Sequence, residues 1–226
     1  MKLIICFFSL LIMLATTFAS AQMITIDFDT DQAGQLPEGF SADLTGNGKS
    51  GHWVVMRDDT APSKPNVLAQ TNMDTTSYRF PLCVFDGLTA KDVDVSVKFK
   101  PLKGEEDQAA GIVLRYSDNN NYYVVRANAL EGNVVFYKVE NGKRKDLKPK
   151  GSNYFAYGKK ANVPSGEWST LGIVAKGTLF EAYLNGNKLF EVEDDTITNA
   201  GKVGLWTKAD SYTLFDDFMV KQSDKQ

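Results

Sequence analysis

Apolar and polar residues alternate along most of this chain, and short clusters of Gly, Asn and Asp interrupt the alternation. The segment 93–99, Val-Asp-Val-Ser-Val-Lys-Phe, alternates without a fault. Successive side chains of a β-strand point to opposite faces, so this period of two predicts a half-buried strand. No stretch carries a sustained apolar repeat of 3.6 residues, so little helix is expected. Similar patterns predict strands at 24–28, 52–56, 66–70, 111–116, 122–128, 134–139, 168–174, 178–184, 188–192, 201–206 and 213–220.

Short turns join these strands in sequence order. Asp and Asn residues at 118–121 and the Glu-Gly-Asn segment 131–133 separate neighbouring strands in the middle of the chain. Asn141-Gly142 and Asn185-Gly186 predict tight hairpins, because both central residues of a type I′ turn need a positive φ. Consecutive hairpins indicate a meander of antiparallel strands.

Two irregular segments, 36–51 and 58–65, are rich in Gly, Pro, Asn or Ser and are predicted to be long surface loops near one end of the sheets. Long loops on a rigid β-scaffold are common locations for binding residues. Roughly a dozen short strands with regular turns favour an all-β fold, a two-sheet antiparallel β-sandwich of the jelly-roll type.

The N-terminal residues predict the compartment. Lys2 precedes an apolar run over 3–14, and small residues end at Ala19-Ser-Ala21. This order is typical of a cleaved signal peptide, here residues 1–21, and the run is short for a membrane span. We therefore expect a secreted protein, extracellular or periplasmic, whose β-sandwich domain covers 22–221 and whose polar tail, 222–226, is frayed.

Charge and cysteine content narrow the partners. The chain carries a net charge of −3, so nucleic acid and anionic membrane surfaces are poor partner candidates. Cys6 leaves with the predicted signal peptide, so Cys83 has no intrachain partner for a disulfide. Because Cys83 lies within the apolar segment 79–85, we expect a buried, inert thiol.

Four segments in the last third occur in a characteristic order: 168–171 (Trp-Ser-Thr-Leu), 180–190, 201–206 (Gly-Lys-Val-Gly-Leu-Trp) and 215–218 (Phe-Asp-Asp-Phe). They resemble the concanavalin A-like and laminin-G-like jelly rolls. More narrowly, residues 90–221 resemble secreted bacterial domains described as 3-keto-disaccharide hydrolase or glycoside-hydrolase-16-like. Such folds host lectins, glycosidases, lyases and adhesion modules, so the function must be argued from the site.

Retaining glycoside hydrolysis is the first candidate chemistry, and it needs two carboxylates about 5–5.5 Å apart. The family-16 glycosidases carry them on a Glu-x-Asp-x-x-Glu strand. Glu105-Glu-Asp107 begins this spacing, but Ala110 stands where the last Glu belongs. Glu193-Asp-Asp195 also begins it and ends in Thr198. The sequence therefore argues against this mechanism.

Histidine or zinc chemistry is the second candidate. His52 is the only histidine, and one His with one Cys does not make a typical zinc shell. His52 is therefore predicted to be a loop or strand-edge residue.

A carbohydrate-binding face on one sheet is the third candidate. Alternation over 111–116 and 122–128 sends one set of side chains, including Tyr116, to the core and the other to an exposed concave face. Sugars stack on aromatic rings, and their hydroxyls need the donors and acceptors of Arg, Asn and Asp. The alternative is that the arginines pair with acidic residues of neighbouring strands and only keep the face soluble. The predicted ligand-binding residues are Arg115, Arg126, Asn128, Trp206, Lys208 and Asp210.

Calcium is the fourth candidate, since similar jelly rolls hold a structural Ca²⁺ where the first and last strands meet. Asp27 and Asp29 flank Phe28, and Asp217 lies in the last predicted strand. If these strands pair, the three carboxylates converge on a site suited to a hard cation.

Three functions follow from these features. The first is a secreted, non-catalytic module that binds glycans or oligosaccharides. The second, implied by the resemblance, is cleavage of 3-keto-glycosides, in which elimination needs one base and one electrophile. The third is an extracellular adhesion module that binds protein. For the second function the candidate bases are Glu181, Asp210 and Asp217, and the candidate electrophiles are Arg126 and Lys208.

Overall fold

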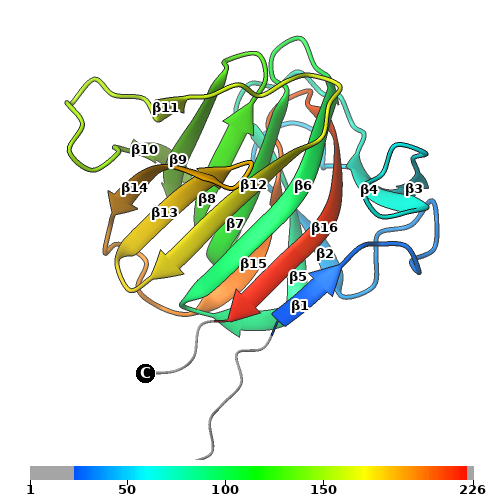
Figure 1. Ribbon diagram of the computed structural model, residues 1–226, viewed down its shortest axis with the longest axis horizontal. Helices are drawn as coiled ribbons and strands as arrows, with labels where there is room; N and C mark the ends of the chain where they lie inside the picture. The colour runs from blue at the N-terminus through cyan, green and yellow to red at the C-terminus, as the bar shows by residue number, and fades with distance from the viewer. Residues whose placement is uncertain (1–22, 223–226) are drawn as a thin grey trace, which may run out of the picture.

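Two antiparallel β-sheets pack face to face in the computed structural model, which describes residues 23–222 (Figure 1). Each sheet has eight strands, and no helix occurs between residues 23 and 222. The predicted two-sheet antiparallel β-sandwich with a jelly-roll fold is therefore confirmed, with sixteen strands in place of roughly a dozen. The predicted signal peptide, residues 1–21, lies outside the described residues.

Sheet A has the strand order β14-β13-β12-β6-β16-β4-β3, and β1 pairs with the end of β16. Its strands are β1 (Met23–Ile26), β3 (Trp53–Arg57), β4 (Asn66–Gln70), β6 (Val93–Lys103), β12 (Ser169–Lys176), β13 (Leu179–Leu184), β14 (Asn187–Glu193) and β16 (Tyr212–Gln222).

Sheet B has the strand order β10-β9-β8-β7-β15-β5-β2, and β11 pairs with β9. Its strands are β2 (Phe40–Gly46), β5 (Arg79–Ala90), β7 (Ala109–Asp118), β8 (Asn121–Asn128), β9 (Asn133–Glu140), β10 (Lys143–Leu147), β11 (Lys159–Lys160) and β15 (Gly201–Trp206).

The hairpins form where the Asn-Gly pairs predict them. Asn141 and Gly142 have φ values of 51° and 74°, and Asn185 and Gly186 have values of 50° and 77°. These positive values match the type I′ requirement, which Asn and Gly meet with little strain.

Two boundary predictions are wrong. The segment 36–51, predicted to be a loop, contains β2, which pairs along β5 from Phe40↔Phe85 to Gly46↔Arg79. Pairing with an apolar neighbour and burial of Phe40 override the turn-rich composition of this segment. Gln222, assigned to the frayed tail, pairs with Val93 at the end of β16. The other predicted loop, 58–65, contains no strand.

The space between the sheets is filled by aromatic and branched side chains. The rings of Tyr123, Phe136 and Phe180 lie 4.7–5.6 Å from one another, centroid to centroid. Such offset aromatic contacts add to the free energy gained by burying apolar area. Cys83 lies in this core as a free thiol, so the predicted burial of this cysteine is confirmed, and burial raises the pKa of its thiol well above the ordinary value.

A second buried cluster covers the outer face of sheet B. Residues 122–128 alternate between the two clusters, so Tyr123 and Val125 face the inter-sheet core while Tyr122 and Val124 face outward. The outward side chains are nevertheless buried, because Phe80, Tyr137 and Trp206 pack around them. The outer face therefore has an apolar floor beside which polar side chains are held away from water.

Candidate functional site

A network of polar side chains crosses the outer face of sheet B, where β8 and β9 meet the loop before β11. Its centre is Arg126, which is fully buried on β8. One terminal nitrogen donates to Asn133 Oδ1 at 2.8 Å. The other donates to Glu131 Oε2 at 2.9 Å, to the Tyr137 hydroxyl at 2.8 Å and to the Tyr157 hydroxyl at 3.2 Å. The guanidinium therefore joins two strands, a turn and a loop.

The second half of the network contains an ion pair. Lys208 Nζ lies 2.6 Å from a carboxylate oxygen of Asp107, which is almost completely buried. Asn128 Nδ2 donates to Asp107 Oδ1 at 2.6 Å and to Glu131 Oε1 at 3.3 Å. Asn128 therefore connects the Lys208–Asp107 pair to the Arg126–Glu131 pair.

Asp210 holds the loop that carries Asp107. Its carboxylate accepts the backbone N–H of Glu105 at 2.6 Å and of Asp107 at 3.0 Å. Ser211 Oγ adds a hydrogen bond from the Ala109 N–H at 3.0 Å. A carboxylate that caps successive N–H groups fixes backbone geometry. Asp210 therefore positions the site rather than facing a ligand.

The two carboxylates of the network have opposite pKa shifts. Burial alone would raise the pKa of Glu131, but the charge and hydrogen bond of Arg126 hold it below its ordinary value. Burial raises the pKa of Asp107, and the neighbouring Lys208 offsets this only in part. Glu131 is therefore a carboxylate at neutral pH, and it is also the more accessible of the two, with its side chain 33% exposed.

The lowered pKa of Glu131 predicts a pH-dependent contribution to stability. A carboxyl whose pKa is lower in the folded state stabilises the protein above its unfolded pKa of about 4.3, and this stabilisation is lost as the pH falls. We expect Glu131→Gln to lower the free energy of unfolding by about 1 kcal/mol at pH 7, with the difference from wild type shrinking below pH about 4. Urea unfolding across this pH range measures the effect.

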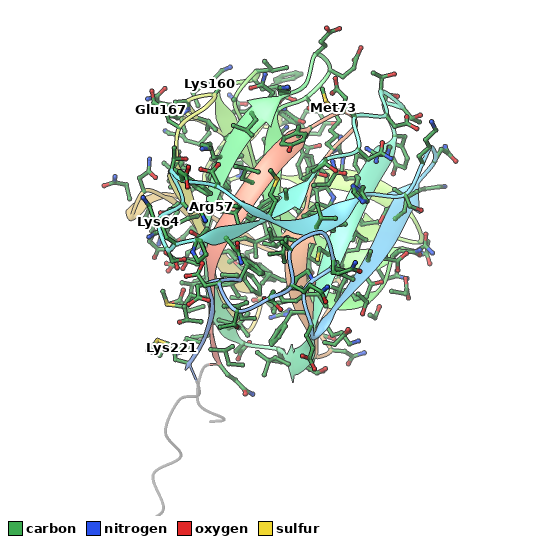
Figure 2. All side chains as sticks on the ribbon, turned by 90° about the vertical axis from the view of Figure 1, so that its right-hand side faces the viewer. Arg57, Lys64, Met73, Lys160, Glu167 and Lys221 are labelled. Carbon is green, nitrogen blue, oxygen red and sulfur yellow. The ribbon has the colours of Figure 1, made fainter. Side chains whose placement is uncertain are left out.

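The matched control is Glu167→Gln, because Glu167 is an exposed carboxylate for which no ion pair is found within residues 23–222 (Figure 2). Its free energy of unfolding should stay within about 0.5 kcal/mol of wild type at every pH. A Glu131→Gln difference that grows as the pH falls would contradict the assignment.

Trp206 lies at the floor of this face, close to the network. Its ring stacks on Phe80 with centroids 5.3 Å apart and planes 19° apart. It lies opposite Gly111, which in turn lies opposite Arg126. A Cβ at Gly111 would come within 3.1 Å of the Trp206 ring, so the glycine allows this close packing. Trp206 is fully buried, so it supports the face and does not offer a free stacking surface.

Arg115 does not lie on this face, and the prediction that it shares a face with Arg126 is wrong. Its φ is 49°, and the pairing of β7 with β8 shifts register between Leu114 and Asp118. Such a β-bulge inserts an extra residue and reverses the alternation after it. Tyr116, predicted to lie in the core, therefore packs against the outer cluster, and its hydroxyl donates to Asp43 at 2.5 Å.

The predicted calcium ligands do not converge. β1 and β16 do pair, with Ile26 opposite Phe218. However, Asp217 lies 2.6 Å from Lys98 Nζ, and Asp29 Oδ1 accepts the Asn66 N–H at 2.9 Å. Asp27 accepts the Asp29 N–H at 3.1 Å. Among residues 23–222, no group of three or more His, Cys, Asp or Glu side chains lies together as metal ligands would, so the three predicted carboxylates do not form one cluster.

The remaining candidates also lie outside the network. Glu181 accepts hydrogen bonds from Lys188 and Tyr183 on the exposed side of sheet A. His52 is exposed just before β3, and its Nδ1 lies 2.7 Å from Thr71 Oγ1, which confirms a strand-edge position. Of the six predicted ligand-binding residues, the structure brings Arg126, Asn128 and Lys208 into the network and places Trp206 on its floor.

Four residues of the network, Asp107, Glu131, Tyr137 and Tyr157, are not among the ligand-binding residues predicted from the sequence. In the sequence, Asp107 belongs to an incomplete glycosidase spacing and Glu131 to a turn. The alternation did contain a signal for Tyr137, which shares the outward parity of Val135 on β9. Tyr157 comes from an irregular loop, and nothing in its sequence indicates that it returns to Arg126.

A groove lies on the other side of that loop. It has a volume of about 790 Å³ and runs between the loop 149–159 and the edge strand β14. Gly158 and Lys159 line the groove, whereas the neighbouring Tyr157 points to Arg126. The groove and the network are therefore separate features that share one loop.

The fold and the network together define a jelly-roll β-sandwich with a polar site on the outer face of one sheet. Residues 40–221 match the family described as 3-keto-alpha-glucoside-1,2-lyase-like domain. This match covers most of the chain, so the protein belongs to that family, and the resemblance noted in the sequence is confirmed. No curated protein sequence matches the chain.

Solved structures agree on the fold. A carbohydrate-binding module, CBM66 from Bacillus subtilis, is 18% identical, covers 81% of this chain and 96% of its own, and gives a TM-score of 0.59. The cellulose induced protein Cip1 is 12% identical, with coverages of 88% and 97% and a TM-score of 0.65. Domain 4 of the extracellular arabinanase AbnA from Geobacillus stearothermophilus, in complex with arabinotriose, is 14% identical, with coverages of 91% and 94% and a TM-score of 0.54.

Between residues 23 and 222, no helix is long and apolar enough to cross a membrane.

Proposed function

We propose that the protein binds a carbohydrate on the outer face of sheet B, over Glu131, Lys208 and Tyr157. The observation that carries this proposal is unused hydrogen-bonding capacity at the edge of a buried network. Lys208 has three donors and one partner, Asp107, among the described residues. Glu131 Oε1 accepts one long hydrogen bond, from Asn128, and retains acceptor capacity.

These groups suit a sugar in kind and in exposure. The side chains of Lys208 and Glu131 are 19% and 33% exposed, and Tyr157 is 44% exposed. A sugar ring can stack on the tyrosine while its hydroxyls donate to Glu131 and accept from Lys208. Arg126, Asn128 and Asp107 hold these groups in place through buried hydrogen bonds, which reduces the entropy lost when a ligand binds.

The family and the N-terminal sequence agree with this proposal. A family named for 3-keto-α-glucosides makes glucose-based oligosaccharides the first ligands to try. The predicted signal peptide supports a secreted protein, which would meet such sugars outside the cytoplasm.

Isothermal titration with glucose disaccharides and their 3-keto forms tests the proposal. We expect at least one of these sugars to bind, and Glu131→Gln and Lys208→Met each to weaken binding about tenfold, because each removes a charged hydrogen bond. Glu167→Gln should bind as wild type does. Absence of binding across the panel, or equal affinities for all four proteins, would refute the proposal.

A second candidate function is β-elimination of a 3-keto-glucoside, because one network brings together a carboxylate, an ammonium group and a phenol. A ketone at C3 acidifies the C2–H, so a carboxylate can remove this proton. The electron pair then forms the C1=C2 double bond while the C1–O bond breaks and the leaving oxygen takes a proton. Glu131 would be the base, Lys208 would stabilise the enolate oxygen, and the Tyr157 hydroxyl would protonate the leaving group, while Arg126 holds both Glu131 and Tyr157 by hydrogen bonds.

Incubation of a 3-keto-α-glucoside with the protein distinguishes the two candidates. Elimination produces a conjugated enone, whose ultraviolet absorbance can be followed. With turnover, Glu131→Gln should reduce the rate at least about a hundredfold, in keeping with loss of a general base. Binding without enone formation by the folded wild type would leave a carbohydrate-binding module.

A further inference from the structure

The segment Lys143–Lys160 is strongly basic in a chain that is acidic overall. It contains seven Lys and Arg residues and one acidic residue, Asp146, whereas the whole chain has a net charge of −3. It includes β10, the loop that follows and β11, all at one lateral edge of sheet B (Figure 1). Positive charge is therefore concentrated on one side of the sandwich.

Several of these lysines have no acidic partner. Lys143, Lys145 and Lys159 are exposed, and none makes an ion pair within residues 23–222. In the β9–β10 pair, Lys143 lies opposite Glu140, whereas Lys145 lies directly opposite Lys138. Like charges facing each other across strands destabilise a sheet, and Lys138 is offset by Asp194 at 2.9 Å while Lys145 is not. An anionic ligand would relieve this repulsion.

An aromatic pair stands at the tip of the same segment. Tyr154 is 82% exposed and Phe155 is 88% exposed, with ring centroids 5.6 Å apart. Asn153 orders the tip, because its side-chain oxygen accepts the Phe155 N–H at 3.0 Å and its carbonyl accepts the Ala156 N–H at 3.1 Å. Lys148 Nζ donates to the Ala156 carbonyl at 2.6 Å. Two large rings held this far into solvent indicate a contact surface.

The groove of about 790 Å³ lies directly beside this tip. Pro149 to Ser152 and Gly158–Lys159 form one wall, and the edge strand β14 forms the other. Lys150, Lys159 and Lys188 line it together with Glu191. Glu191 pairs with Lys150 at 3.7 Å and with Lys188 at 2.9 Å, so among the described residues Lys159 is the groove lysine without an ion pair. Its walls combine ammonium groups and small polar residues with the apolar surface of Leu189 and Phe190.

We propose that the basic segment, its aromatic tip and this groove form a second binding surface for an acidic polysaccharide, a sugar chain bearing carboxylates. Lysine ammonium groups suit carboxylates, and exposed aromatic rings suit the apolar faces of pyranose rings. The surface goes beyond the site over Glu131, because it lies on the opposite face of the loop that carries Tyr157.

Lysines and aromatic residues also occur where proteins attach to anionic membranes. The groove favours the polysaccharide, since an open cleft between a loop and a strand can hold a sugar chain whereas a bilayer presents a broad surface. The Lys150 N–H donates to the Glu191 carbonyl at 2.7 Å, so a backbone hydrogen bond joins the two walls of the groove.

Titration with oligogalacturonate and with the same chains after methyl esterification tests this surface. We expect the full-length wild type to bind the acidic chains about tenfold more tightly than the neutral esters, with affinity falling as salt rises. The triple variant Lys143→Gln, Lys145→Gln, Lys159→Gln should lose this preference. Tyr154→Ala with Phe155→Ala should weaken binding of both forms.

The matched control replaces three exposed lysines elsewhere, Lys64, Lys176 and Lys221, by Gln. Figure 2 shows the separation: Lys160, at the end of the basic segment, lies towards one end of the molecule, and the control residue Lys221 lies at the other. The affinity of this control variant for acidic chains should match wild type within about twofold. Three results would each overturn the proposal. The wild type could bind acidic and esterified chains with equal affinity, or the two triple variants could lose equal affinity. The wild type could also bind phosphatidylglycerol vesicles without binding the chains. Because Glu131→Gln should leave acidic-chain binding unchanged, failure of the sheet-B site and failure of this surface give different results.

Discussion

Replacing Arg115 by Met is expected to lower the free energy of unfolding by about 3 kcal/mol and to leave carbohydrate binding unchanged. The guanidinium is buried and donates to the carbonyl oxygens of Lys91 at 3.1 Å, Ile197 at 2.7 Å and Gly177 at 2.5 Å. It also lies 5.0 Å from the centroid of the Phe180 ring. Methionine fills similar space but leaves three backbone acceptors without their donor.

These carbonyls belong to three separate connections, β5–β6, β12–β13 and β14–β15, so one side chain ties together one end of both sheets.

Urea unfolding measures the loss of stability, and titration with the sugar that wild type binds checks the site. Arg115→Lys should recover only part of the stability, because an ammonium lacks the planar fork. Arg57→Met is the exposed control, since the Arg57–Asp59 pair is largely in solvent and should contribute less than about 1 kcal/mol (Figure 2). Loss of sugar binding by a folded Arg115→Met protein would contradict this structural role.

Replacing Arg126 by Met is expected to lower stability by a similar amount, about 3 kcal/mol, and in addition to abolish carbohydrate binding. The buried guanidinium supplies donors to Glu131, Asn133 and Tyr137, so its removal takes one hydrogen bond from each of them and leaves Glu131 with only amide donors. Glu131 also loses the cation that lowers its pKa. The same urea and titration experiments measure both effects.

The double variant Arg126→Met, Glu131→Gln separates the pair from its surroundings. If the ion pair carries the effect, the two substitutions together should cost less than the sum of the single costs, by about 1 kcal/mol or more. Additive costs would show that Arg126 acts through Asn133 and Tyr137 instead. Retention of wild-type sugar affinity by the folded single variant would place the ligand elsewhere.

The contrast between these two arginines shows where prediction from sequence succeeded and failed. Strict alternation was enough to predict the strands around 93–99 and 122–128 and hence the fold, because burial of one sheet face imposes a period of two. The bulge at Arg115 has no sequence signal of this kind, since one extra residue reverses every later side chain without changing composition. Arg126, one strand away, kept its predicted face.

The missing half of the site has another physical cause. Asp107 reaches Lys208 because Asp210 bends the preceding loop, and this contact joins residues about a hundred positions apart. Tyr157 reaches Arg126 from a loop with no periodicity. Such contacts depend on how loops close in three dimensions, which alternation within strands does not encode.

The pairing of β1 with β16 places both ends of the domain side by side, with Met23 opposite Lys221 (Figure 1). β16 begins next to Asp210 and Ser211 and ends at Gln222, so the loops beside Lys208 lie at the far end of the same strand. A tether fixed to either terminus would therefore leave those loops pointing away from the attachment point. An attachment through the two-stranded pair of β1 and β16 would leave the end of the domain that carries Lys208 exposed to solvent.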